Sequence, residues 1–172
     1  MTSTILSLPI HLQGHSFDLS LATEADIPAI RILVNASYKE LSDMGLNYTA
    51  TYQDEEVTRE RMSQGKTFVL RMQNEIVATV LFSVKNYYTF RRTAYVSQFA
   101  VVPELKRHGI GTYLMDYCEA MAKEEHFDGI QLDTAKPARH LVNWYQKRGY
   151  QIVGETRWEG KTYESWIFEK TF

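Results

Sequence analysis

The sequence predicts an α/β protein in which one mixed sheet carries helices on both faces. Three observations support this fold class. Residues 109–125 have the apolar spacing of a long amphipathic helix, and residues 67–71 and 76–84 have the pattern of two strands in a hairpin. Strand and helix patterns then alternate to the C-terminus, in the overall order β-α-α-β-β-β-α-β-α-β-β. This alternation is typical of a layered sheet with flanking helices.

The N-terminal third contributes one strand and two helices. Residues 17–21 form a short predicted strand. Thr23 and the acids after it are typical of a helix start, and apolar residues keep helical spacing as far as Leu41. Asp43-Met44-Gly45 ends this helix. A second, shorter helix is expected over residues 53–63, before the hairpin with its Gln73-Asn74-Glu75 turn.

The remaining elements alternate after the hairpin. A strand that ends at Pro103 is followed by the long helix, and Gly149 is placed to end the last helix. The predicted ranges are 94–102 for the strand, 109–125 for the helix, 129–134 for a strand, 137–148 for a helix, and 150–153 and 162–169 for the last two strands.

Length and composition predict one domain over residues 1–172, with a short N-terminal extension at 1–16. The net charge of −2 argues against nucleic-acid binding, and no apolar run approaches the roughly 20 residues of a membrane span. Residues 1–12 lack the basic start of a secretory signal. Cys118 is the single cysteine, which excludes an internal disulfide or a cysteine-based zinc site. We therefore expect a cytoplasmic protein that uses no metal and has no nucleic-acid or membrane partner.

Residues 100–112 connect a strand to a helix through a basic, glycine-containing loop. The first turn of a helix has backbone N–H groups without partners and carries partial positive charge. Gly109 and Gly111 allow a ligand to approach that backbone, so the segment suits a phosphate or pyrophosphate. The dinucleotide pattern would need a third glycine and an acidic residue, and the Walker loop would need a lysine before Thr112. Neither pattern is complete.

Two motifs resemble the GCN5-related N-acetyltransferase (GNAT) superfamily. The first is Pro103-x-x-Lys106-x-x-Gly109-x-Gly111, preceded by Phe99-Ala100-Val101, and the second is Tyr145-Gln146-Lys147-Arg148-Gly149-Tyr150. Element order matches over residues 19–168, and the motifs lie within 95–153. The resemblance implies a mostly antiparallel sheet of six to seven strands with a splayed parallel pair, flanked by about four helices on both faces.

The resemblance also implies acetyl-CoA as co-substrate. Backbone groups of one splayed strand would pair with the pantetheine, and the loop with the first turn of the helix would hold the pyrophosphate. The strand residues are Phe99, Ala100 and Val101, and the loop and helix residues are Lys106, Arg107, His108, Gly109, Ile110, Gly111 and Thr112. Two positions depart from the family pattern. Lys106 replaces an arginine or glutamine, and Ala138 stands where many members carry a cofactor-binding asparagine, for which Arg139 or Asn143 could substitute.

The resemblance makes Tyr145 the group that protonates the departing thiolate, although a tyrosine at this helical position also suits core packing. Acetyl transfer requires a neutral amine and hence a base. Asp133 and Glu104 are the two candidates, and a carboxylate at the end of a strand can equally be a structural cap. Gln98 could orient a water but cannot act as a base.

Aromatic residues are concentrated where the family places its acceptor pocket, and such a pocket suits an amine through cation–π attraction. Packing among themselves or on a second copy is the alternative. They are Tyr38, Tyr48, Tyr52, Tyr87, Tyr88 and Phe90.

The resulting hypothesis is direct acetyl transfer to a primary amine of a small molecule, amino acid or peptide. The alternative is a non-catalytic acyl-CoA-binding module. Exchange of a C-terminal edge strand, residues 161–169, is one route to a homodimer.

Overall fold

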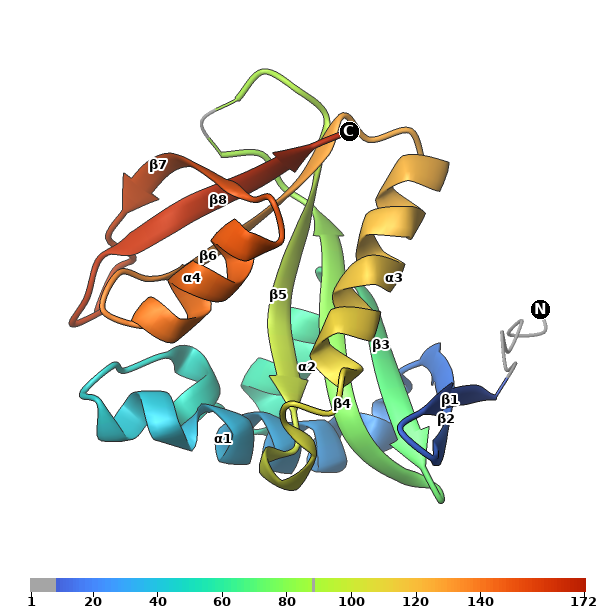
Figure 1. The fold of residues 1–172 in the computed structure, drawn as a ribbon. Helices are drawn as coiled ribbons and strands as arrows, with labels where there is room; N and C mark the ends of the chain where they lie inside the picture. Colours follow the sequence, from blue (N-terminus) through green and yellow to red (C-terminus); the bar gives the residue numbers. More distant parts are fainter. Residues whose placement is uncertain (1–8, 88) are drawn as a thin grey trace.

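The computed structural model describes residues 9–87 and 89–172, which contain one eight-stranded sheet with the order β1-β2-β3-β4-β5-β6-β8-β7 (Figure 1). The strands are β1 (Ile10–Leu12), β2 (His15–Leu21), β3 (Gly65–Met72), β4 (Glu75–Val84), β5 (Thr93–Val101), β6 (Gly129–Ala135), β7 (Gln151–Thr156) and β8 (Ser165–Thr171). The α-helices are α1 (Ile27–Asp43), α2 (Glu55–Met62), α3 (Ile110–Glu124) and α4 (Arg139–Lys147). Short 3-10 turns lie at Glu24–Asp26, Thr49–Thr51 and Pro103–Leu105.

The predicted fold class is confirmed. All seven predicted strands and all four predicted helices are present, and the structure has one further strand. The additional strand, β1, pairs antiparallel with β2 through a turn in which Gln13 and Gly14 have positive φ. It lies in the segment 1–16 that we expected to be an extension, of which residues 1–8 lie outside the described part. The pattern Ile10-His11-Leu12 was too short to stand out from its surroundings.

The dimer route predicted through residues 161–169 is wrong because these residues do not form an edge strand. β8 pairs antiparallel with β6 on one side and with β7 on the other. Its backbone groups are therefore occupied within the sheet, and β1 and β7 are the edge strands. Alternating sequence patterns indicate a strand but not its position in the sheet.

The splayed parallel pair is β5 and β6. They pair only over Thr93–Tyr95 and Gly129–Gln131, although β5 continues to Val101 and β6 to Ala135. Figure 1 shows the two ribbons diverging toward α1 and α4. All other neighbouring strands are antiparallel. The side of β5 that faces β6 is thus left without a strand partner over its second half.

A bulge in β5 changes which side chains face which helices. Gln98 has φ 50°, and the register with β4 shifts between Thr79 and Leu81. Before the bulge, Val96 packs in the same core as α3. After it, Phe99 packs in that core, while Ala100 packs with α1. The bulge therefore turns Phe99 toward the start of α3 and toward α4.

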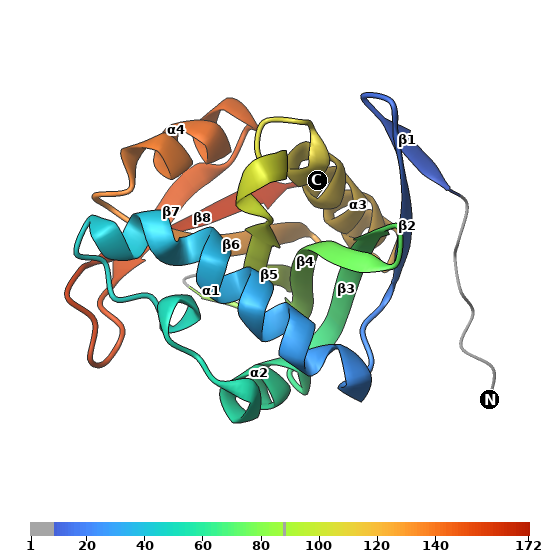
Figure 2. The same ribbon diagram turned by 90° about the horizontal axis from the view of Figure 1, so that it is seen from below.

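The helices divide between the two faces of the sheet (Figure 2). α3 and α4 contribute Leu114, Met115 and Tyr145 to the large core. α1 packs Leu33 and Val34 against the opposite face, and α2 lies beside α1. Within the described residues, no helix combines the length and apolarity that a membrane crossing requires.

Candidate active site

The divergence of β5 and β6 leaves a cavity of about 390 Å³ beside the loop before α3, here called the loop cavity. Most of the predicted cofactor-binding residues and Tyr145 line it. They are Phe99, Ala100, Val101, Lys106, Arg107, Gly109, Gly111 and Thr112. His108 and Ile110 do not line it. The His108 ring lies 2.9 Å from the Lys106 carbonyl oxygen, and Ile110 is buried in the core.

The first turn of α3 has an accessible backbone that a ligand could approach closely. Gly109 precedes the helix with φ 82°, and no side chain caps the first turn. Arg107 also has a positive φ, 67°, which makes the loop turn sharply and leaves its side chain exposed. A Cβ at Gly111 would lie 3.2 Å from Cζ of Phe99. Only glycine leaves this point open without moving the ring, and an uncapped helix start of this kind can bind an anionic ligand.

Lys106, one of the predicted cofactor-binding residues, lines the loop cavity and also makes contacts within the protein. Its ammonium donates to the Ser37 carbonyl oxygen at 3.2 Å and lies 3.6 Å from a carboxylate oxygen of Glu40. In the same region the Ser37 and Tyr38 hydroxyls donate to the carbonyl oxygens of Val101 and Phe99. These contacts fasten α1 to β5 and to the loop.

Ala138 stands where many family members carry a cofactor-binding asparagine. Its side chain is fully buried and cannot contact a ligand. Arg139 and Asn143 are exposed and are not among the residues that line the loop cavity. α4 presents His140 and Trp144 there instead, and the Trp144 ring stacks on Phe99 at 5.9 Å. Sequence spacing pointed to the helix but not to these side chains.

Tyr145 is both a core residue and a wall of the loop cavity. Its side chain is 7% exposed and its ring contacts those of Trp144 and Phe168. Its hydroxyl forms no hydrogen bond with any residue that the structure describes. Burial raises the pKa of Tyr145 well above its ordinary value, so the phenol keeps its proton and can donate it in a hydrogen bond.

A second cavity, of about 500 Å³, lies on the other side of Tyr38 and is here called the aromatic cavity. Among the described residues, Tyr38 alone lines both cavities. The other walls of the aromatic cavity come from α2, the 45–52 segment, the β4–β5 connection, β5, β6 and the β7–β8 connection. The aromatic members are Tyr38, Tyr48, Tyr87, Tyr95, Trp158 and Tyr163, and the charged members are Glu60, Arg61, Lys85, Asp133, Glu159 and Lys161.

Asp133 lines the aromatic cavity and is held by two donors. The Tyr95 hydroxyl donates to one carboxylate oxygen, and Nε1 of Trp158 donates to the other at 3.0 Å. These contacts orient the carboxylate and leave its remaining lone pairs for a ligand. Glu104 is exposed on the Pro103–Leu105 turn and lines neither cavity, whereas Gln98 lines the aromatic cavity.

The structure brings part of the predicted aromatic set to one cavity. Tyr38, Tyr48 and Tyr87 line the aromatic cavity. Tyr52 and Phe90 do not, because both rings are exposed outside it. Tyr88 lies outside the described residues.

Sequence reasoning missed Tyr95, Trp158 and Tyr163, since long-range contacts bring them there. Asn47, for example, accepts from the Thr162 N–H at 2.8 Å and donates to the Gly160 carbonyl oxygen.

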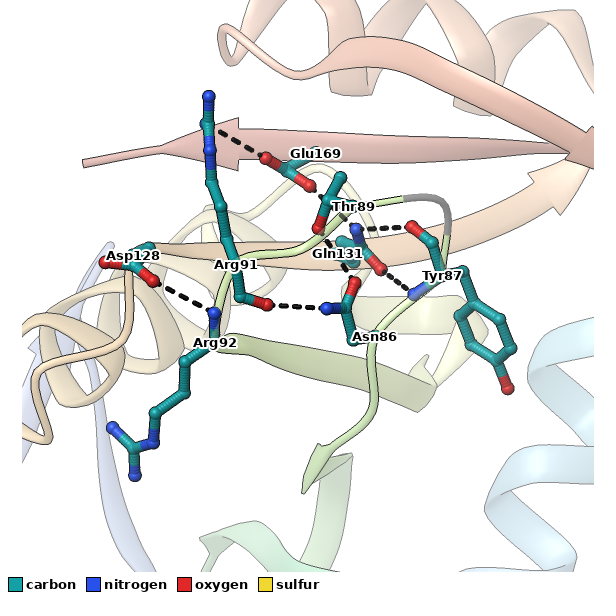
Figure 3. A network of polar contacts seen from close by, with 8 residues as sticks. All are labelled: Asn86, Tyr87, Thr89, Arg91, Arg92, Asp128, Gln131 and Glu169. Carbon is teal, nitrogen blue, oxygen red and sulfur yellow. Dashed lines mark hydrogen bonds and ion pairs between the residues drawn. The ribbon is translucent and has the colours of Figure 1, made fainter.

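A buried polar network fixes the wall that carries Tyr87 (Figure 3). The Gln131 amide accepts from the Tyr87 N–H and donates to the Tyr87 carbonyl oxygen, both at 2.8 Å. Gln131 also donates to the buried Glu169, which pairs with Arg91 at 3.3 Å. The Gln131 side chain thereby binds this connection as a neighbouring strand would, and the Tyr87 ring packs against Trp158.

Comparisons with known proteins agree with this geometry. The family model "Acetyltransferase (GNAT) family" matches residues 30–150, more than half of the chain. The chain is similar to the S-alkylcysteine N-acetyltransferase of Bacillus subtilis (strain 168), with 24% identity over 145 residues, 81% of this chain and 82% of that protein.

Among solved structures, a GNAT family acetyltransferase from Listeria monocytogenes matches with a TM-score of 0.74 and 15% identity, over 96% of this chain and 100% of that one. A GNAT family acetyltransferase from Elizabethkingia anophelis with acetyl-CoA bound matches with a TM-score of 0.68 and 15% identity, over 91% and 98%. The chain belongs to the acetyltransferase (GNAT) family.

Proposed function

We propose that this protein is an acetyl-CoA-dependent N-acetyltransferase that moves an acetyl group directly to the primary amine of a small molecule, amino acid or peptide. The observation that carries the proposal is the pair of cavities that meet at Tyr38. The loop cavity contains the uncapped start of α3 and the Tyr145 hydroxyl, which has no described hydrogen-bond partner. The aromatic cavity has aromatic walls and the Asp133 carboxylate, which two hydrogen bonds orient. Two substrates can therefore occupy adjoining spaces at the same time.

The residues of the loop cavity fit acetyl-CoA, which supplies the acetyl group as a thioester. Backbone groups of Phe99, Ala100 and Val101 would bind the pantetheine as an added strand would. The loop from Lys106 and the first turn of α3, through Thr112, would hold the pyrophosphate. In this assignment Lys106 stabilises the loop by its contacts with α1, and Arg107 provides the accessible positive charge.

Asp133 and Tyr145 would manage the protons of the reaction. The acceptor amine must lose a proton to gain a nucleophilic lone pair, and Asp133 accepts that proton directly or through a water. The nitrogen then bonds to the acetyl carbon, the carbon–sulfur bond breaks, and the nitrogen releases its second proton to water, because the amide keeps one N–H. Tyr145, which keeps its proton because of burial, donates to the sulfur that carries the leaving charge. Each residue thus acts on one side of the transferred group.

Cys118 supports direct transfer. Its side chain is buried within α3 and lines neither cavity. Burial raises the pKa of the Cys118 thiol to about 12, which keeps it protonated and unreactive at neutral pH. The single cysteine is therefore not a candidate for a covalent acetyl-enzyme.

Amino acids with an apolar side chain suit the aromatic cavity best. Tyr48, Tyr163 and Trp158 offer apolar ring surface, and ring faces attract an ammonium. The Bacillus subtilis relative is named for S-alkylcysteines, which combine an α-amine with an apolar thioether chain. These compounds are the first acceptors to test.

The proposal is tested by incubating the purified protein with acetyl-CoA and a panel of S-alkylcysteines, other amino acids, simple amines and peptides. Free CoA thiol and the acetylated product are both measured. We expect equal amounts of thiol and N-acetyl product with at least one primary amine. Calorimetric binding of CoA without transfer to any amine would instead favour a non-catalytic acyl-CoA-binding module, and absence of CoA binding would contradict both functions.

A further inference from the structure

Two cations of the aromatic cavity, Arg61 and Lys85, have no carboxylate partner in the described part of the chain. Both side chains are half-buried. The Lys85 ammonium donates to the Gln64 side-chain oxygen at 3.0 Å, and the Arg61 guanidinium forms no hydrogen bond or ion pair with a described residue. Partly buried charges without a counter-ion lose hydration without compensation, so this arrangement is suited to an anionic ligand.

The third cation of the cavity, Lys161, has a structural role. Its ammonium donates to the Asn47 carbonyl oxygen at 3.0 Å, the Thr49 hydroxyl at 2.8 Å and the Tyr52 hydroxyl at 3.2 Å. An ammonium has three protons, and these contacts use all of them. Lys161 therefore holds the β7–β8 connection against the segment before α2, while Arg61 and Lys85 keep free donors.

The carboxylates of the cavity form no ion pair with Arg61 or Lys85 in the described residues. Asp133 accepts hydrogen bonds from Tyr95 and Trp158 and acts on Lys85 only through its charge, at longer range. Glu60 and Glu159 are exposed, so water screens their charges. Burial, followed by the charge of Arg61, lowers the pKa of Lys85, and the charge of Asp133 opposes this shift without cancelling it. A bound anion would relieve both effects.

We propose that Arg61 and Lys85 form a subsite that binds a carboxylate carried by the acceptor. This inference rests on the proposed function and narrows the acceptor to amines with a carboxylate, of which α-amino acids are the simplest. A guanidinium binds a carboxylate through two parallel N–H donors, and Lys85 adds a point charge. The loop cavity is separate from this subsite, because no residue of 105–112 lines the aromatic cavity.

Asp133 and Arg61 both act on Tyr38, which lines the two cavities. Burial raises the pKa of Tyr38, the charge of Asp133 adds to the rise, and the charge of Arg61 opposes it. Both charges thus act on the residue that joins the two cavities. An α-amino acid has its ammonium and carboxylate on the same carbon. Binding of its carboxylate by Arg61 and Lys85 would leave the ammonium between that pair and Asp133.

The test compares S-methylcysteine with S-methylcysteine amide and with 2-(methylthio)ethylamine, which lack the carboxylate charge. Transfer rates are measured for the wild type, Arg61→Gln and Lys85→Gln. Arg59→Gln is the matched control, since Arg59 lies on the same helix and pairs with Glu24 on the surface. The rate of each variant is divided by that of the wild type for the same compound, so the differences between the amine pKa values of the three compounds do not affect the comparison.

We expect Arg61→Gln to lower kcat/KM for S-methylcysteine by about tenfold or more, the loss typical of a charge-assisted hydrogen bond, mainly through KM. Lys85→Gln should act in the same direction. The KM for acetyl-CoA and the rates with the two uncharged compounds should change little, and Arg59→Gln should match the wild type. Equal losses with all three compounds, or no loss with S-methylcysteine, would overturn the subsite.

Failure of the proposed function would look different, as no compound would then be acetylated. Calorimetric binding of S-methylcysteine and its amide to the wild type and to Arg61→Gln still tests the subsite in that case. Tighter binding of the acid than of the amide by the wild type only would support it, and equal binding would contradict it.

Discussion

Tyr145→Phe should lower kcat by about 10²-fold or more while the affinity for CoA stays close to that of the wild type. The ring packs against Trp144 and Phe168, and phenylalanine preserves that packing. The hydroxyl has no hydrogen-bond partner among the described residues, so its removal leaves no buried group unsatisfied. What is lost is the donor to the departing sulfur, and general acid catalysis typically contributes 10² to 10⁴ in rate.

The measurement is kcat with a good acceptor, together with the Kd for CoA and the free energy of unfolding. Tyr117→Phe is the matched control, because Tyr117 packs its ring on Phe68 from α3 and lines neither the loop cavity nor the aromatic cavity. It should leave kcat unchanged. A Tyr145→Phe variant with wild-type kcat and wild-type affinity would show that this tyrosine only packs the core.

Asp133→Asn should lower kcat/KM by about 10²-fold or more, and the deficit should shrink as the pH rises through the pKa of the acceptor amine. Asparagine keeps the size of the side chain and one oxygen acceptor for Tyr95 or Trp158, but it cannot take a proton. At low pH the amine is protonated and depends on the base. At high pH solution supplies the neutral amine, so the base contributes less.

A structural role for Asp133 would produce a different pH profile. Loss of a cap would lower the free energy of unfolding and reduce activity by a similar factor at every pH. Asp18→Asn, an exposed carboxylate on β2, is the control for the chemical change and should behave as the wild type. A constant deficit for Asp133→Asn across the pH range would contradict its assignment as the base.

Local sequence patterns predicted most of the fold and the loop cavity because the interactions involved are local. The Gln73-Asn74 turn, the amphipathic α3 and the glycines before it are each specified by a few neighbouring residues. The family motifs then placed β5 and Tyr145 at one site. His108 and Ile110 were assigned to that site by position in the motif. Their side chains do not line the loop cavity, since one turns to the loop backbone and the other enters the core, and the role of their backbone N–H groups stays a prediction.

The aromatic cavity could be predicted only in part, since its walls come from distant segments. Trp158 reaches Asp133 from the β7–β8 connection, and Gln131 fixes Tyr87 across 44 residues of sequence. The bulge at Gln98 interrupts the alternation of β5, so a period-two pattern assigns Phe99 to the wrong face. Only tertiary structure reveals such contacts.

The most direct test of two adjoining cavities is a two-substrate kinetic analysis. Initial rates are measured over a range of acetyl-CoA concentrations at several fixed concentrations of S-methylcysteine. Direct transfer between the loop cavity and the aromatic cavity requires both substrates to be bound at the same time. This predicts double-reciprocal lines that intersect. Parallel lines, the pattern of a covalent acetyl-enzyme, would contradict the account.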